Sequence, residues 1–112
     1  MYVVNPKRLE KIEAAKGVTR QVIPFGDRLM FVLFEFQPNA SVPGHRHSEE
    51  QIGLVLRGKA EFNVEGKVIV AEEGMVYWFP PNVKHGAKVG AEGGLFLDVF
   101  SPPRKDFTYR TK

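Results

Sequence analysis

The sequence predicts an all-β domain whose sheet closes into a small barrel or jelly roll. Most of the chain beyond residue 18 consists of short segments rich in β-branched and aromatic residues, and Gly, Pro or Asn separates each from the next. Several segments, such as residues 29–36, are apolar on both alternating faces. Strands of that kind fit a closed sheet whose outer face meets a second copy of the chain, so we also expect a homodimer.

A short N-terminal helix is expected before the strands. Asn5 can cap its start, and Pro6 suits its first turn. Leu9 and Ile12 stand three positions apart, the spacing of neighbours on one helical face. Gly17 can end the helix, because helices commonly stop at a glycine.

The strand segments follow the helix in order. They cover residues 19–25, 28–36, 51–58, 59–70, 75–80, 87–90 and 94–100. Within residues 59–70, Glu65 and Gly66 predict a tight hairpin turn, because Gly adopts the positive φ that such a turn needs. No internal repeat or linker interrupts the series, so we expect a single domain over residues 1–112.

Composition limits the possible functions. The 16 basic and 13 acidic residues leave a thinly spread net charge of +3, which suits a small anionic ligand better than nucleic acid. The chain has no cysteine, so a metal site must use His, carboxylate or amide ligands. It has neither a signal pattern nor an apolar run near the ~20 residues that span a bilayer, so we expect a cytoplasmic protein without a membrane partner.

All three histidines fit one constellation. His45 and His47 lie two positions apart in "PGHRHSEEQIGLVLRG", so an extended backbone would project both rings to one side. Gln51 follows at an even offset on that side, and His85 comes after a later strand segment. The alternative is that these are scattered surface histidines, which are common. Because no histidine is left over, we favour a four-ligand metal site.

The segment "GLFLDVFSPPRKDF" contains a carboxyl group and a guanidinium group that are close together in the chain. Its alternation places Leu95, Leu97 and Val99 on one face and Phe96, Asp98 and Phe100 on the other. If the second face lines the barrel, partial desolvation would raise the pKa of Asp98 and suit it to proton transfer near neutral pH. Arg104, beyond two prolines, can offer a planar fork to a carboxylate. The alternatives are an Asp98 exposed on an edge strand and an Arg104 solvated in the tail.

The histidine segment resembles the first motif of the cupin superfamily. The pattern His45-x-His47-x3-Gln51-x6-Gly58 is similar to that motif, in which two histidines are followed by Glu, sometimes Gln, and then Gly. The resemblance implies the cupin double-stranded β-helix, a jelly-roll barrel. Gln51 departs from the commoner Glu, and as a neutral ligand it would leave a bound divalent cation with its full charge.

The second cupin motif is matched by Gly74-x5-Pro80-x-Asn82-x2-His85, although Val89 stands where Asn is frequent. The two motifs together imply one divalent metal ion per chain. Zn, Mn, Fe, Ni and Co all accept such ligands, so the ligand set does not choose among them. The motif spacing places the ligand at position 51 and not at Glu49 or Glu50, which we expect to be solvated.

Three segments, "HRHSEEQIGLVLRG", "WFPPNVKHG" and "LDVFSPPRKDF", resemble a narrower group, the pectin-degradation cupins that act on unsaturated monouronates. The resemblance covers roughly residues 20–107. It implies conversion of a cyclic 4,5-unsaturated uronate, a small anionic sugar, to its linear keto form. The implied metal ligands are His45, His47, Gln51 and His85; Asp98 would transfer protons, and Phe100 and Arg104 would position the substrate.

Two other functions remain open. Small cupins with this motif set differ in substrate, and a fold does not fix a function. The chain could be another metal-dependent enzyme, such as an isomerase, a dioxygenase or a decarboxylase. It could also be a non-enzymatic cupin that binds a sugar or metabolite.

Overall fold

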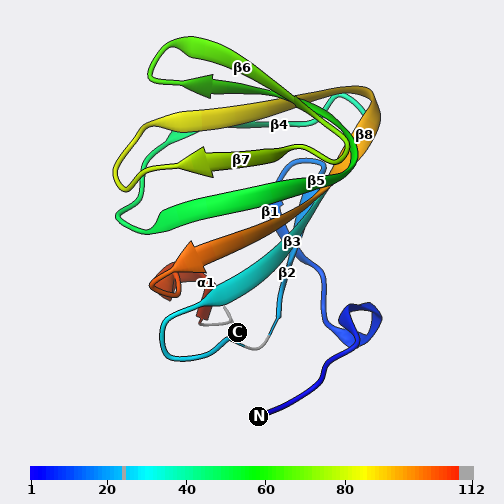
Figure 1. The fold of residues 1–112 in the computed structure, drawn as a ribbon. Helices are drawn as coiled ribbons and strands as arrows, with labels where there is room; N and C mark the ends of the chain where they lie inside the picture. Colours follow the sequence, from blue (N-terminus) through cyan, green and yellow to red (C-terminus); the bar gives the residue numbers. More distant parts are fainter. Residues whose placement is uncertain (24, 109–112) are drawn as a thin grey trace.

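Antiparallel strands rolled into a barrel make up most of this computed structural model, which describes residues 1–23 and 25–108 (Figure 1). The elements are η1 (Pro6–Arg8), β1 (Ile12–Ala15), β2 (Val18–Val22), β3 (Met30–Phe36), β4 (Ser41–His45), β5 (Glu50–Val64), β6 (Lys67–Glu72), β7 (Val76–Phe79), β8 (His85–Ser101) and α1 (Lys105–Thr108). The predicted all-β jelly roll is confirmed.

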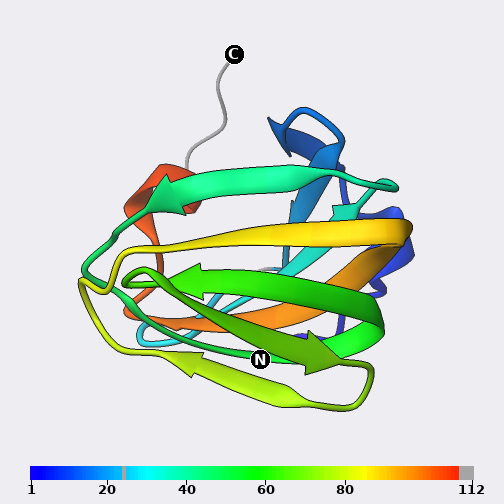
Figure 2. The same cartoon turned by 90° about the horizontal axis from the view of Figure 1, so that it is seen from above.

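Two long strands, β5 and β8, form the frame of the barrel. They pair with each other from the Glu50–Ser101 pair to the Val64–His85 pair, and their pairing slips twice, between Val55 and Arg57 and again before Ala60. Such irregularities bend strands, and here they let both strands pass from one layer of the roll to the other (Figure 2).

Each half of the long strands takes a different neighbour. The second half of β8 pairs with β3 and the first half of β5 pairs with β7. The first half of β8 pairs with β4, and the second half of β5 pairs with β6. Strands β2 and β1 extend the first layer beyond β3. The candidate site lies where the start of β5, the start of β8 and the end of β4 meet.

The predicted N-terminal helix is much shorter than expected. Asn5 accepts a hydrogen bond from the Lys7 amide at 3.0 Å and Pro6 opens the turn, as predicted, but the 3-10 helix ends at Arg8. Residues 12–15 instead form β1, paired with β2, and Gly17 lies in the turn between them. Pairing with a neighbouring strand outweighs the helix propensity of this segment.

Most predicted strands are present, but the sequence missed two strands and divided each of two long strands into two segments. Strands β1 and β4 were not expected, whereas residues 51–58 and 59–64 are one strand, β5, and residues 87–90 and 94–100 both belong to β8. The segment predicted at 19–25 corresponds to β2, and position 24 lies outside the described residues. The turn at Glu65 and Gly66 is confirmed, with φ of 50° and 83° between paired Val64 and Lys67.

The barrel interior is aromatic. One buried cluster gathers Phe36, Phe62, Tyr77, Phe79 and Phe96, and a second gathers Met30, Val32 and Phe100. In β8 the predicted alternation is confirmed, because Phe96, Asp98 and Phe100 are buried while Leu95, Leu97 and Val99 are only partly covered. No helix within residues 1–23 and 25–108 has the length and apolar character to cross a membrane.

Candidate metal centre and its cavity

Three strand ends bring the histidines together. His45 is the last residue of β4 and pairs directly with His85, the first residue of β8. His47 follows in the loop before β5, and the main-chain amide of Asn82 donates to its carbonyl oxygen at 2.8 Å. The ring centroids are 4.6 to 5.6 Å apart, and one nitrogen of each ring lies within 4.8 Å of the others.

The second nitrogen of every ring is already engaged. The Nδ1 atoms of His45, His47 and His85 lie 3.1, 3.0 and 2.9 Å from the carbonyl oxygens of Pro43, Glu49 and Val83. A carbonyl oxygen only accepts hydrogen bonds, so each Nδ1 carries the ring proton. Each Nε2 is therefore left with a free electron pair, the form in which imidazole binds a metal.

Gln51 adds an oxygen to this cluster. Its side chain is buried, with the residue 7% exposed, and its Oε1 lies 3.1 Å from Nε2 of His47. The bend at residues 48–49 interrupts the extended path assumed from the sequence, so it is the pairing of Gln51 with Phe79 and Phe100 that brings it here. Two electron pairs that face each other at this distance repel unless a cation lies nearby, so the donor set fits a divalent ion.

Neither neighbouring glutamate joins the cluster. Glu50 is exposed, and its Oε2 accepts a hydrogen bond from the indole of Trp78 at 2.7 Å. Glu49 is not solvated as predicted, since its side chain is only 13% exposed and its Oε1 lies 3.5 Å from Nδ1 of His47. That position is on the far side of the ring from the cluster, where a carboxylate can orient the imidazole.

Burial keeps two of the imidazoles neutral. It lowers the pKa of His85 to about 4, and the neighbouring positive charges add a smaller effect in the same direction. Burial also lowers the pKa of His47, with a further contribution from the charge of Arg104. Neutral rings at neutral pH can offer their electron pairs to a cation without first losing a proton.

Asp98 lies beside the histidines at the centre of the sheet. It is 2% exposed on β8, between β3 and β5, which excludes the alternative of a surface charge on an edge strand. Burial raises the pKa of Asp98 to about 6, although hydrogen bonds from Tyr77 and Gln51 and the charge of Arg104 oppose the shift. A carboxyl group with such a pKa can both accept and donate a proton near neutral pH.

Sequence reasoning missed Tyr77. Its hydroxyl donates to Oδ1 of Asp98 at 2.6 Å, and burial together with the nearby carboxylate raises the pKa of Tyr77 well above its ordinary value. The available signal was the alternation of β7, which turns Tyr77 inward together with Phe79. A buried tyrosine hydroxyl usually requires a hydrogen-bond partner, and Asp98 supplies it.

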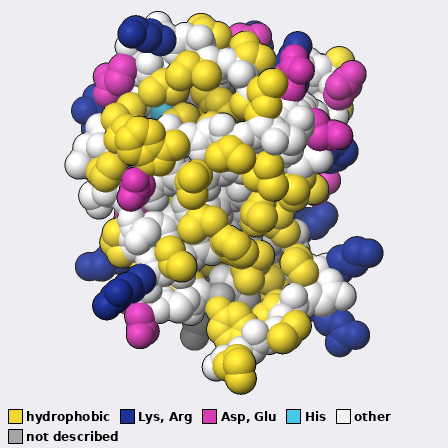
Figure 3. Space-filling view, in the orientation of Figure 1, with side chains coloured by type: hydrophobic (Ala, Val, Ile, Leu, Met, Phe, Trp, Pro, Cys, Tyr) yellow, Lys and Arg dark blue, Asp and Glu magenta, His cyan; other side chains and the backbone are white. Residues whose placement is uncertain are grey.

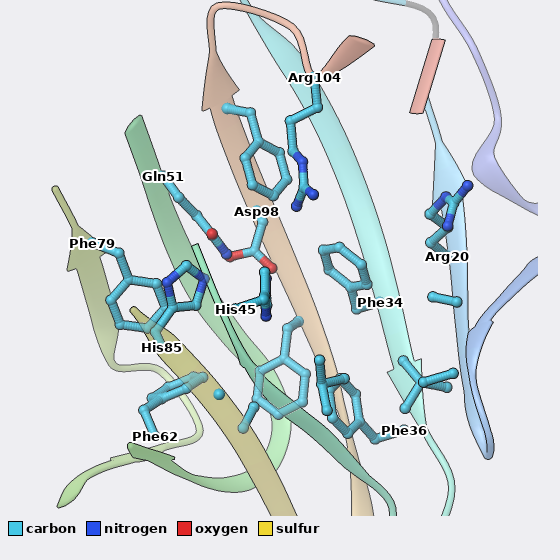
Figure 4. A pocket seen from close by; sticks show the side chains of 18 of the residues that line it. Arg20, Phe34, Phe36, His45, Gln51, Phe62, Phe79, His85, Asp98 and Arg104 are labelled. Atoms are coloured by element: carbon cyan, nitrogen blue, oxygen red, sulfur yellow. The ribbon is translucent and has the colours of Figure 1, made fainter. Parts of the chain in front are cut away.

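A cavity of about 400 Å³ joins these groups to two arginines (Figure 4). The Arg104 side chain is 11% exposed, so it is not a solvated tail charge, and its guanidinium lies 5.2 Å from the Phe100 ring centre and 4.0 Å from that of Phe107. Phe100 also contacts the His47 ring, with centroids 5.6 Å apart. Arg20, not singled out from the sequence, lines the cavity from β2 and stacks on Phe107 at 4.4 Å.

Comparison with known proteins shows the family of this chain. Residues 32–100 match the family described as Cupin domain. The chain belongs to the cupin family. This cupin is 34% identical over 96 residues to the pectin degradation protein KdgF of Dickeya dadantii (strain 3937), which covers 85% of the chain and 87% of the relative.

Two solved structures resemble the cupin along almost its full length. An RmlC-like cupin from Shewanella frigidimarina NCIMB 400 superposes with a TM-score of 0.87 at 33% identity and covers 96% of both chains. KdgF from Halomonas sp. superposes with a TM-score of 0.85 at 28% identity and covers 96% of this chain and 97% of the other.

Proposed function

We propose that this cupin is a metal-dependent enzyme that converts cyclic 4,5-unsaturated monouronates to their linear keto forms. The observation that carries the proposal is the cavity lined by His45, His85, Asp98 and Arg104, which opens onto a cluster of three imidazoles. Two of the similar proteins are named KdgF, and one of them is described as a pectin degradation protein. The proposed ligands are His45, His47, Gln51 and His85.

The proposed reaction is an isomerisation with no redox change. Ring opening breaks the bond between the anomeric carbon and the ring oxygen, removes the proton of the anomeric hydroxyl to form an aldehyde, and places a proton on the former ring oxygen to leave an enol. Conversion of the enol to the ketone places a proton on the former C4 alkene carbon and removes the enol proton. A divalent ion held by the histidines and Gln51 would polarise a substrate oxygen.

The other roles belong to side chains of the cavity. Asp98 accepts and returns the protons, because a carboxyl group with a pKa of about 6 is present in both forms near neutral pH. Arg104 binds the substrate carboxylate through its planar fork. Phe100 forms an apolar wall between Arg104 and His47 and orients the sugar ring.

The test combines metal analysis with turnover. Purified protein should carry about one divalent ion per chain, and unsaturated galacturonate or its alginate counterpart should lose the ultraviolet absorbance of its double bond when the protein is added. Asp98→Ala should keep the metal and lose turnover. Full activity in that variant would remove Asp98 from the mechanism, and wild-type protein that binds the sugar without turnover would instead favour a sugar-binding cupin.

A further inference from the structure

Three strands place a carboxyl group, a glycine and a tyrosine in one row. Gly53 on β5 pairs with Asp98 on β8 and, on its other side, with Tyr77 on β7. Side chains of one row point to the same face of a sheet, and this row faces the barrel interior. Asp98 and Tyr77 are therefore second neighbours across the sheet, with only the glycine between them.

Gly53 is what allows the two outer side chains to meet. A Cβ atom on Gly53 would collide with Oδ1 of Asp98 and with the ring of Tyr77. Because that space is free, the Tyr77 hydroxyl reaches Oδ1 of Asp98 and forms the 2.6 Å hydrogen bond above the glycine.

Gln51 holds the same carboxylate from the metal side. Its amide nitrogen donates to the Asp98 carboxylate, and the two side chains point toward each other (Figure 4). Its amide oxygen faces His47 in the histidine cluster. A single amide thus presents an acceptor to the candidate cation site and a donor to the candidate proton carrier.

We propose that Gln51 and Tyr77 are positioning residues for Asp98, and that residue 51 is an amide because it must face a cation on one side and a carboxylate on the other. A glutamate at this position would place two buried carboxyl groups against each other, and they would repel unless one of them took up a proton. The inference rests on the proposed function, since it gives Asp98 the task of moving protons.

The arrangement also selects one oxygen of Asp98. Oδ1 is engaged by the Tyr77 hydroxyl in both protonation states, because that hydroxyl can donate to a carboxylate and to a neutral carboxyl group alike. The proton exchanged with substrate is therefore carried by Oδ2. Without Tyr77, the carboxyl group could rotate and present either oxygen in a less defined direction.

The first arm of the test needs no substrate and no metal. Stability of the metal-free protein against urea is measured at pH 8 for wild type, Gln51→Glu, Asp98→Asn and the double variant. Gln51→Glu should lower the urea midpoint when Asp98 is intact and should be tolerated in the Asp98→Asn background, where the exchanged carboxylate and amide again form a hydrogen bond. An equal loss in both backgrounds would overturn the proposed role of the amide.

The second arm separates positioning from packing. Tyr77→Phe keeps the ring, and we expect its kcat to fall by about 10-fold to 100-fold with little change in KM, because the misplaced acid affects the reaction more than binding. The matched control is Trp78→Phe, which removes a 2.7 Å hydrogen bond to Glu50 from the outer face of the same strand. Equal kinetics for both variants would overturn the role of Tyr77. If wild type does not turn over unsaturated uronates, the proposed function fails, while the urea measurements still decide the role of Gln51.

Discussion

Each candidate metal-binding histidine is oriented by the carbonyl oxygen of a residue two positions away in the chain. The local main chain therefore sets which nitrogen carries the proton, before any ligand is present. This orientation lowers the reorganisation needed when a cation binds. Arg104 is arranged differently, because its Nη2 donates to a carboxylate oxygen of the exposed Asp106 at 2.9 Å. A substrate carboxylate can take the place of that side chain.

The role of Arg104 predicts a kinetic difference between two substitutions. Arg104→Ala removes both the charge and the fork, whereas Arg104→Lys keeps the charge only. A charge-assisted bidentate contact is worth about 1.5–3 kcal/mol, so we expect KM for the unsaturated uronate to rise about 10-fold to 100-fold in Arg104→Ala and nearly as much in Arg104→Lys. Initial rates over a range of substrate concentrations measure this. An unchanged KM in both variants would assign the carboxylate to another residue.

At the level of single residues, the sequence predicted the candidate ligands and Asp98 better than it predicted the residues that surround and position them. The four candidate ligands could be selected from the spacing of the three histidines and Gln51 and from the resemblance to the cupin motifs, and Asp98 from its alternation with two phenylalanines. Tyr77 and Arg20 could not be selected, since their importance depends on which strands become neighbours. Glu49 was placed wrongly because a loop bend, not sequence spacing, turns it toward His47.

At the level of strands, what the sequence did not predict also depends on which strands become neighbours. Alternation within one segment predicted the inward face of β8, but the register between β8, β5 and β7 joins residues far apart in the chain. Strand β4 contains Pro43 and Gly44, which are depleted in strands, so only its pairing with β8 reveals it. Likewise, β1 contains helix-favouring residues and exists because β2 pairs with it.

The row that contains Gly53 predicts a large effect of a single methyl group. Gly53→Ala should destabilise the protein by about 1–3 kcal/mol, because the added carbon would force Asp98 and Tyr77 apart in a packed interior. Gly90→Ala is the matched control on β8, since no atom lies within 4 Å of a Cβ built there. Urea denaturation of the metal-free variants measures both. Equal stability of the two variants would show that the row can relax at little cost.

At the scale of the whole molecule, the face opposite to the cavity is apolar. Phe31, Val99, Ile52 and Trp78 form one outward row across β3, β8, β5 and β7. Phe31, Ile52 and Trp78 are between 45% and 56% exposed, and the space-filling view shows hydrophobic side chains gathered over this face (Figure 3). A continuous apolar face of this kind is typical of an interface between subunits.

We therefore propose that two copies of the chain form a homodimer through this row. Ile52→Asp places a charge at its centre and should convert the dimer to a species with the 12.6 kDa mass of one chain. Val68→Asp is the control, because Val68 is also exposed, at 62%, but lies on β6 away from the row. Light scattering coupled to gel filtration gives the masses. A monomeric wild type at micromolar concentration would contradict the interface.

The cavity also determines how the metal-free protein responds to acid, because two buried groups respond in opposite ways. The pKa of His85 falls from 6.5 to about 4 on folding, so as the pH drops below 6.5 the unfolded chain takes up a proton first and stability is lost. The pKa of Asp98 rises from 3.8 to about 6, so between these values the folded chain takes up the proton first and stability is gained. Between pH 6 and pH 4 the two effects largely cancel.

Removing the ionisable group of Asp98 should make the effect of His85 on stability measurable. Asp98→Asn keeps the size of the side chain and an acceptor for Tyr77, but it abolishes the stabilising uptake of a proton. Between pH 6 and pH 4, the free energy of unfolding of the variant should fall relative to that of wild type by up to about 1.4 kcal/mol per pH unit. Urea denaturation of both metal-free proteins at intervals from pH 7 to pH 4 measures the difference. Parallel curves would mean that Asp98 keeps an ordinary pKa in the folded protein, and the carboxylate would then be a weaker base that is poorly matched to proton transfer near neutral pH.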